Sequence, residues 1–189
     1  METIDPRYLL RDVAKILEEI GIPYCVTGGM AVYKWGRPRF TADIDIVIQL
    51  VPKNIDILAE KLLTLNEASY ISKEAMQRAL VHHGEFNFID GVTNVKVDFW
   101  VLGNDEFHKN QLRRRISEEV YGQTIYFVSP EDLILSKLLW HKESESTKQL
   151  EDIKSVIEVQ EILDWEYLGR WTKTQETWHI LESLRKRVK

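Results

Sequence analysis

Residues 24–49 read YCVTGGMAVYKWGRPRFTADIDIVIQ, and this stretch decides the fold. An apolar run ends in Gly28 and Gly29, a short helix-like segment follows, and Asp43 and Asp45 then alternate with isoleucines. Successive side chains of a strand point to opposite faces, so the two carboxylates share one face. Two like charges side by side on an apolar strand are costly unless a cation neutralises them. Carboxylate and water ligands favour Mg²⁺ or Mn²⁺ over zinc.

Composition narrows the class of protein. A chain of 189 residues with 44% hydrophobic content can bury the core of one domain, with room for a helical extension. The net charge of -5 argues against a surface that binds nucleic acid by charge alone. Cys25 is the single cysteine, which excludes an internal disulfide. With no N-terminal signal sequence and no apolar run near the roughly 20 residues that span a bilayer, we expect a cytoplasmic protein with no membrane partner.

Hydrophobic periodicity predicts mixed strands and helices up to residue 128 and helices alone from residue 129. We therefore expect a catalytic domain over 1–128 and a helical C-terminal region over 129–189. Asp5 is an expected N-cap with Pro6 at the first helical position, and Ser129 and Pro130 form a strong helix start. The expected helices cover residues 6–20, 30–35, 53–65, 73–81, 104–115, 130–142, 148–160 and the chain from 164 onward. The expected strands cover residues 24–27, 43–49, 118–121 and 124–128, with a hairpin around the turn at 90–91.

The second strand of that hairpin carries a third acid. Lys96, Asp98 and Trp100 share the face opposite the valines, so Asp98 is an acid on a strand in an apolar setting. Asp98 is therefore a third candidate metal ligand.

These features together resemble the nucleotidyltransferase superfamily with the DNA polymerase β-like fold. Its motif is an apolar strand, a Gly-Gly or Gly-Ser pair, a short helix, a strand with Asp-x-Asp, and a later strand with a third Asp. The run RFTADIDIVI (39–48) is most similar to AbiEii/MenT-type toxin nucleotidyltransferases and their uncharacterised relatives. Lys137 and the run KQLED (148–152) resemble the downstream Lys helix and Lys/Arg-Asp-x-x-Asp segment of that group. Gln149 stands where the pattern has its first Asp.

The resemblance implies an α/β (α+β) fold, in which a small mixed sheet flanked by helices is joined to a helical C-terminal region. It implies a metal-dependent enzyme that transfers an NMP from an NTP, with ATP binding expected, to a hydroxyl of RNA, protein or a small molecule. The implied cofactor is Mg²⁺ or Mn²⁺. A toxin role would add an antitoxin partner. Implied metal-binding and catalytic residues are Asp43, Asp45 and Asp98; implied nucleotide-binding residues are Gly28, Gly29, Arg39, Thr41 and Lys137.

Other interpretations stand beside this one. The alternative function is a non-catalytic nucleotide-binding or interaction module on the same fold. Residues 113–115, three arginines, form either a charge cluster at a helix end or a contact with RNA or a partner. Asp152 either pairs with Lys148 on its own helix, which we favour, or helps to bind the nucleotide.

Overall fold

The computed structural model describes residues 5–188, with side chains up to residue 186. Its centre is one mixed seven-stranded sheet with the order β3-β4-β5-β2-β1-β7-β6. The strand β2 runs antiparallel to β1 on one side and parallel to β5 on the other. The strands are β1 (Tyr24–Thr27), β2 (Ile44–Ile48), β3 (Tyr70–Ile71), β4 (Glu85–Ile89), β5 (Lys96–Val101), β6 (Ile116–Val120) and β7 (Gln123–Phe127).

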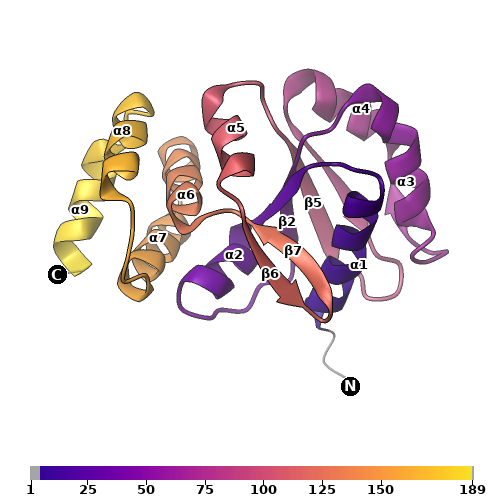
Figure 1. Ribbon diagram of the computed structural model, residues 1–189, viewed down its shortest axis with the longest axis horizontal. Coiled ribbons are helices and arrows are strands. Elements are labelled where there is room, and N and C mark those ends of the chain that lie inside the picture. The colour runs from indigo at the N-terminus through magenta and orange to yellow at the C-terminus, as the bar shows by residue number, and fades with distance from the viewer. Residues whose placement is uncertain (1–4, 189) are drawn as a thin grey trace.

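Helices flank this sheet and continue beyond it, which confirms the predicted fold class (Figure 1). A 3-10 turn (Pro52–Asn54) leads into α3. The helices are α1 (Pro6–Glu19), α2 (Gly28–Trp35), α3 (Ile55–Leu63), α4 (Lys73–His82), α5 (Glu106–Arg113), α6 (Pro130–Ser144), α7 (Thr147–Val159), α8 (Trp165–Thr174) and α9 (Trp178–Val188).

Local sequence signals account for the helix ends. Asp5 caps α1 by accepting a 3.0 Å hydrogen bond from the backbone N–H of Arg7, and Pro6 occupies the first turn. Ser129 caps α6 in the same way, accepting from the N–H of Asp132 at 3.2 Å. These two helix starts were predicted from the same residues, and the structure confirms both.

Several elements differ from the prediction. The strand β2 begins at Ile44, so Asp43 precedes the strand and is not part of it. The helical stretch predicted from residue 164 onward divides into α8 and α9. The helix α2 begins at Gly28 and not at Met30, so the two glycines form its first turn. The strand β3 has only the two residues Tyr70 and Ile71, too few to show a periodic pattern, and it was not predicted.

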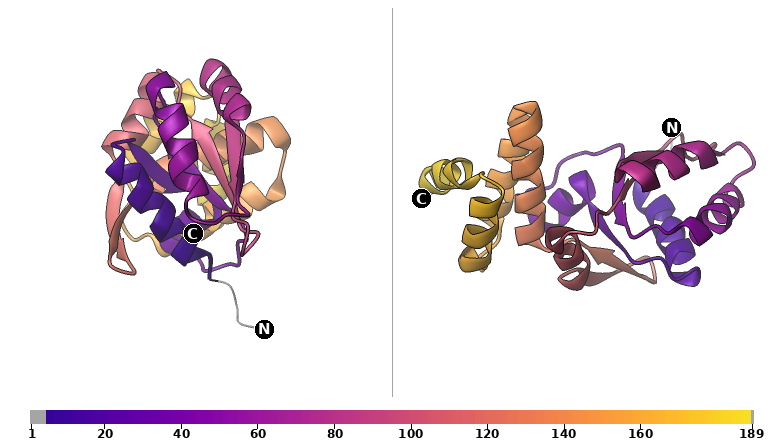
Figure 2. Two further views of the ribbon diagram at one scale, coloured as in Figure 1. Left: turned by 90° about the vertical axis from the view of Figure 1, so that its right-hand side faces the viewer. Right: turned by 90° about the horizontal axis from the view of Figure 1, so that it is seen from above.

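The helices after residue 129 gather at one end of the molecule, and α3 and α4 lie at the other (Figures 1 and 2). The helix α2 packs against both α6 and α7, which joins the sheet to this helical end. The boundary at residue 129 stays a prediction, although the last strand ends at Phe127 and only helices follow within residues 5–188. No helix in that range is long and apolar enough to cross a bilayer.

The three consecutive arginines serve separate contacts within the chain. Arg113 pairs with Glu106 at 3.0 Å, and Arg114 pairs with Glu131 at 3.0 Å. The guanidinium of Arg115 lies 4.1 Å from the centre of the Tyr126 ring. These contacts support the interpretation as a charge cluster at the end of α5.

Candidate active site

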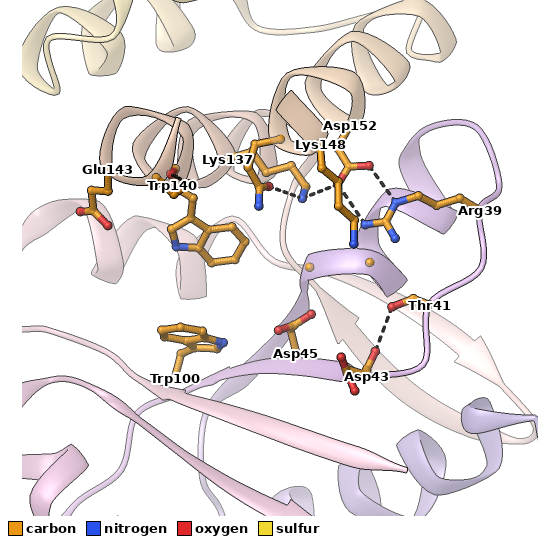
Figure 3. Close-up of a pocket in the computed structure, with 14 residues that line it drawn as sticks. Arg39, Thr41, Asp43, Asp45, Trp100, Lys137, Trp140, Glu143, Lys148 and Asp152 are labelled. Carbon is orange, nitrogen blue, oxygen red and sulfur yellow. Dashed lines mark hydrogen bonds and ion pairs between the residues drawn. The ribbon is translucent and has the colours of Figure 1, made fainter. Parts of the chain in front are cut away.

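A cavity of about 410 Å³ lies where the start of α2, the β2 and β5 strands, and the helices α6 and α7 meet (Figure 3). All predicted site residues except Asp98 line it. The lining residues are Gly28, Gly29, Arg39, Thr41, Asp43, Asp45, Trp100, Lys137, Trp140, Glu143, Ser144, Lys148, Gln149 and Asp152.

The two glycines allow the acidic strand to approach the first turn of α2. Gly28 has φ of +59°, and a Cβ added there would overlap the carboxylate of Asp45. A Cβ added at Gly29 would overlap the side chain of Thr41. The glycines are therefore needed for space as well as for backbone conformation, and they hold Asp45 against a helix N-terminus. Thr27, the residue before α2, makes no side-chain capping hydrogen bond, so the first N–H groups of α2 are not capped by it.

Asp45 and Asp98 are direct neighbours across the parallel pairing of β2 with β5. Burial raises the pKa of Asp45, and the nearby charge of Asp98 raises it further. The indole N–H of Trp100 points toward Asp45 (Figure 3) and opposes that rise. Asp98 is itself buried and pairs with Lys96 at 2.7 Å. Asp45 and Asp98 thus lie on adjacent strands, with Asp43 just before β2 and the carboxylate of Asp98 held by a lysine.

The carboxylates at this site supply part of the ligand set that a divalent cation needs. No cationic side chain among the described residues pairs with Asp43 or Asp45, so these two carboxylates are free to act as hard oxygen ligands. No cluster of three or more His, Cys, Asp or Glu side chains within residues 5–188 is arranged to hold a metal. Asp43 and Asp45 are therefore the candidate ligands, and the role of Asp98 stays a prediction.

A buried ion-pair network forms the wall opposite the acidic strand. Both oxygens of Asp152 accept from Arg39, at 2.8 Å from Nε and 3.0 Å from Nη2. Nζ of Lys137 donates to Asp152 at 2.7 Å and to the side-chain oxygen of Gln149 at 2.9 Å. The predicted pairing of Asp152 with Lys148 is wrong. Arg39 and Lys137 surround Asp152 because α2, α6 and α7 pack together, and only the fold brings these residues within reach.

This network sets the charge of its members. Burial alone would raise the pKa of Asp152, but the hydrogen bonds from Arg39 and Lys137 hold that pKa below its usual value. Burial lowers the pKa of Lys137, and the charge of Asp152 opposes that shift. An ammonium has three N–H donors, and two of those on Lys137 are used within the chain. The third remains to reach a ligand in the cavity that Lys137 lines.

A comparison with known protein families identifies the family of the chain. The model of the family described as "Nucleotidyl transferase AbiEii toxin, Type IV TA system" matches residues 17–150. This span contains the glycine turn, all three acids and Lys137, and it covers well over half of the chain.

The chain belongs to the AbiEii family.

Solved structures share the fold of this AbiEii-family chain at low sequence identity. The antibiotic-resistance factor ANT(2'')-Ia, crystallised with adenylyl-2''-tobramycin, is 15% identical with a TM-score of 0.61, covering 92% of this chain and 98% of its own. A nucleotidyltransferase-like protein from Paracoccidioides brasiliensis is 18% identical with a TM-score of 0.57, covering 95% and 91%. The lincosamide adenylyltransferase LnuA is 13% identical with a TM-score of 0.55, covering 84% and 99%. A sequence comparison with curated proteins finds no match.

Several lining residues of the AbiEii-family site were not predicted as site residues. Trp100 shares a strand face with Asp98, and this shared face was the one available signal. Trp140 lies one helical turn after Lys137, which places the two on one face of α6. Neither tryptophan stands in a local motif, and the two are 40 positions apart in the sequence. The remaining unpredicted lining residues are Glu143, Ser144, Lys148 and Gln149.

Proposed function

We propose that this AbiEii-family protein is a metal-dependent nucleotidyltransferase that moves an NMP from an NTP to a hydroxyl on RNA, protein or a small molecule. One observation carries the proposal. The glycine turn at the start of α2 and the carboxylates of Asp43 and Asp45 converge on one cavity, and cationic side chains line the same space. Backbone N–H groups, paired acids and cations in one place are the groups that a triphosphate and its metal require.

The reaction exchanges one phosphorus–oxygen bond for another. The acceptor hydroxyl oxygen attacks the α-phosphorus, the bond from the α-phosphorus to the α–β bridging oxygen breaks, and pyrophosphate leaves. The hydroxyl proton needs a base. Asp98, on β5 beside Asp45, would accept it, and its pairing with Lys96 would have to loosen for that role.

The chain's own residues would position the triphosphate. The N–H groups in the first turn of α2, at Gly28 and Gly29, suit phosphate oxygens because the helix N-terminus carries partial positive charge. The remaining N–H of Lys137 would donate to a phosphate oxygen. Arg39 would contribute mainly by holding Asp152, with Thr41 packed against Gly29.

Asp43 and Asp45 would hold Mg²⁺ or Mn²⁺, since both are oxygen ligands without an ion-pair partner among the described residues. A bound divalent cation would neutralise charge that builds up on the attacking and leaving oxygens.

The family description also names a toxin of a type IV toxin–antitoxin system. We extend the proposal to that role, which would give this protein an antitoxin as partner. Expression of the wild-type chain should then slow growth, and the Asp43→Asn/Asp45→Asn variant at equal abundance should not. Equal toxicity of the two would contradict a toxin that acts by nucleotidyl transfer.

Label transfer tests the enzymatic proposal. Purified protein would be incubated with each α-³²P-NTP, with Mg²⁺ or Mn²⁺, and with total RNA, cell extract or aminoglycosides as acceptors. Wild-type protein should place label on one acceptor class, and the Asp43→Asn/Asp45→Asn variant should place none. The Lys53→Gln variant, which changes an exposed residue of the 3-10 turn outside the cavity lining, is the matched control and should retain activity. Equal labelling by wild type and the double variant would contradict the proposal.

A further inference from the structure

Two tryptophans form one end of the active-site cavity. The rings of Trp100 from β5 and Trp140 from α6 lie with their centres 5.9 Å apart and their planes tilted by 39°. Both are partly exposed rather than sealed in the core. Large aromatic side chains on a cavity wall are the surfaces on which planar ligands stack.

Charge is distributed unevenly along the cavity. Glu143 stands beside the tryptophans at one end, whereas Arg39 and Lys148 lie at the other, with the acidic strand between the two ends (Figure 3). A triphosphate carries several negative charges, so it is attracted to the cationic end and repelled by Glu143. The uncharged part of an NTP is therefore directed to the tryptophan end.

Two contacts hold the Trp140 ring in place. Nζ of Lys137 lies 5.6 Å from the centre of the Trp140 ring, a cation–π distance, and Trp100 packs against Trp140. A base inserted between two parallel rings needs centres about 7 Å apart, twice the contact distance of about 3.5 Å. At 5.9 Å the tryptophans contact each other, so a planar ligand would stack on the surface that they present to the cavity.

We infer that Trp100 and Trp140 form the nucleobase subsite, with the base of the NTP stacked on them and the triphosphate running toward Arg39 and Lys148. This inference rests on the proposed function, because it assigns the orientation of the NTP in the same site. Nε1 of Trp100 is buried and has no hydrogen-bond partner within the described part of the chain. This N–H points toward Asp45, so Trp100 lies at the junction between the base end of the cavity and the acids.

The test separates the base from the phosphates. Binding of each NTP and of inorganic tripolyphosphate, both with Mg²⁺, would be measured by calorimetry for wild type, Trp140→Leu and the Trp100→Leu variant. Stacking on aromatic side chains typically contributes enough for a loss of about tenfold or more on truncation. The leucine variants should bind NTPs about tenfold more weakly and tripolyphosphate with unchanged affinity. Tryptophan fluorescence should be quenched by NTPs and not by tripolyphosphate.

Two control variants distinguish a loss of base stacking from a general effect of removing a tryptophan. Trp178→Leu removes a partly exposed tryptophan of α9, outside the cavity, and should change neither affinity. Trp140→Phe retains an aromatic face and should lose much less NTP affinity than Trp140→Leu, which guards against a leucine variant that folds poorly. Equal binding of NTP and tripolyphosphate by wild type, or equal losses for both ligands in the variants, would overturn the base subsite alone. Binding of neither ligand by wild type would overturn the proposed function as well.

Discussion

At the scale of single residues, the site depends on close approaches that only glycine permits. Gly28 has a positive φ, and the carboxylate of Asp45 occupies the place where a Cβ of residue 28 would lie. Gly122 also has a positive φ, +77°, but nothing lies within 4 Å of the place of its Cβ. Comparing substitutions at Gly28 and Gly122 therefore distinguishes the cost of backbone strain, which both positions share, from the cost of a steric clash, which only Gly28 adds.

Gly28→Ala should lower the free energy of unfolding by more than Gly122→Ala, because it adds a steric clash to a backbone cost of about 1 kcal/mol. It should also displace Asp45 and abolish Mg²⁺-dependent NTP binding, whereas Gly122→Ala should leave that binding intact. Urea unfolding and calorimetry measure the two effects. Normal NTP binding by Gly28→Ala would contradict the role assigned to the glycine turn.

At the scale of elements, ion pairs between helices hold the two sides of the cavity together. Asp152 on α7 joins α6 through Lys137 and the loop after α2 through Arg39, and all of these contacts are partly or fully buried. Removing one member leaves buried charges without a partner, which is far more costly than losing a surface pair.

Asp152→Ala should therefore lower the free energy of unfolding by about 3 kcal/mol. Lys148→Ala removes an exposed lysine four residues earlier on the same helix. This variant should change the free energy of unfolding by no more than about 0.5 kcal/mol. Urea denaturation of both variants gives the comparison. Similar losses in the two variants would indicate that Lys148, and not Arg39 with Lys137, is the partner of Asp152.

A second buried carboxylate links α6 to α8. Asp132 accepts hydrogen bonds from the hydroxyls of Tyr167 at 2.6 Å and Ser129 at 2.8 Å, and Arg114 lies 3.4 Å away. Burial raises the pKa of Asp132 despite these partners, and neighbouring Glu131 adds to the rise. Folded protein therefore keeps a proton on Asp132 at pH values where the unfolded chain has lost it.

Stability contributed by this group is present at low pH and is lost as pH rises from about 4 through the raised pKa. Asp132→Asn removes that titration. The difference in melting temperature, variant minus wild type, should therefore increase as pH rises from about 4 toward neutrality, as followed by circular dichroism. A difference that stays constant or decreases over this range would show that the pKa of Asp132 is not raised.

At the scale of the whole molecule, the sequence shows most of the fold because its signals are local. Caps at Asp5 and Ser129, the alternation around Asp45 and the apolar periodicity of α1 each act within a few residues. The two-residue β3 gives no such signal. The start of α2 at Gly28 was missed because glycine is a poor helix former, and here it is required by Asp45 across the sheet.

The candidate site also has one part that local sequence signals predict and another part that they do not. Its glycine turn and acids follow from a motif in residues 28–45, and the structure brings them to one cavity. The partners of Asp152 could not be predicted, since Arg39 lies 113 positions away and Lys148 was the nearest cation on the same helix face. The tryptophan pair likewise exists only after β5 and α6 pack together.

Ligand binding should stabilise the whole molecule through this cavity. Mg²⁺ with NTP at about 100 times its dissociation constant adds about 2.7 kcal/mol, which raises the melting temperature by roughly 5–10 °C for a chain of this size. The Asp43→Asn/Asp45→Asn variant should show no such rise. Equal stabilisation of both proteins would show that NTP binds elsewhere.

The measurement that tests the central claim most directly compares two positions of the label. Once an acceptor is found, parallel reactions would use the same NTP labelled at the α-phosphate or at the γ-phosphate. Nucleotidyl transfer predicts that α-label appears on the acceptor and that γ-label leaves as pyrophosphate. Label on the acceptor from the γ-phosphate would show phosphoryl transfer and contradict the account.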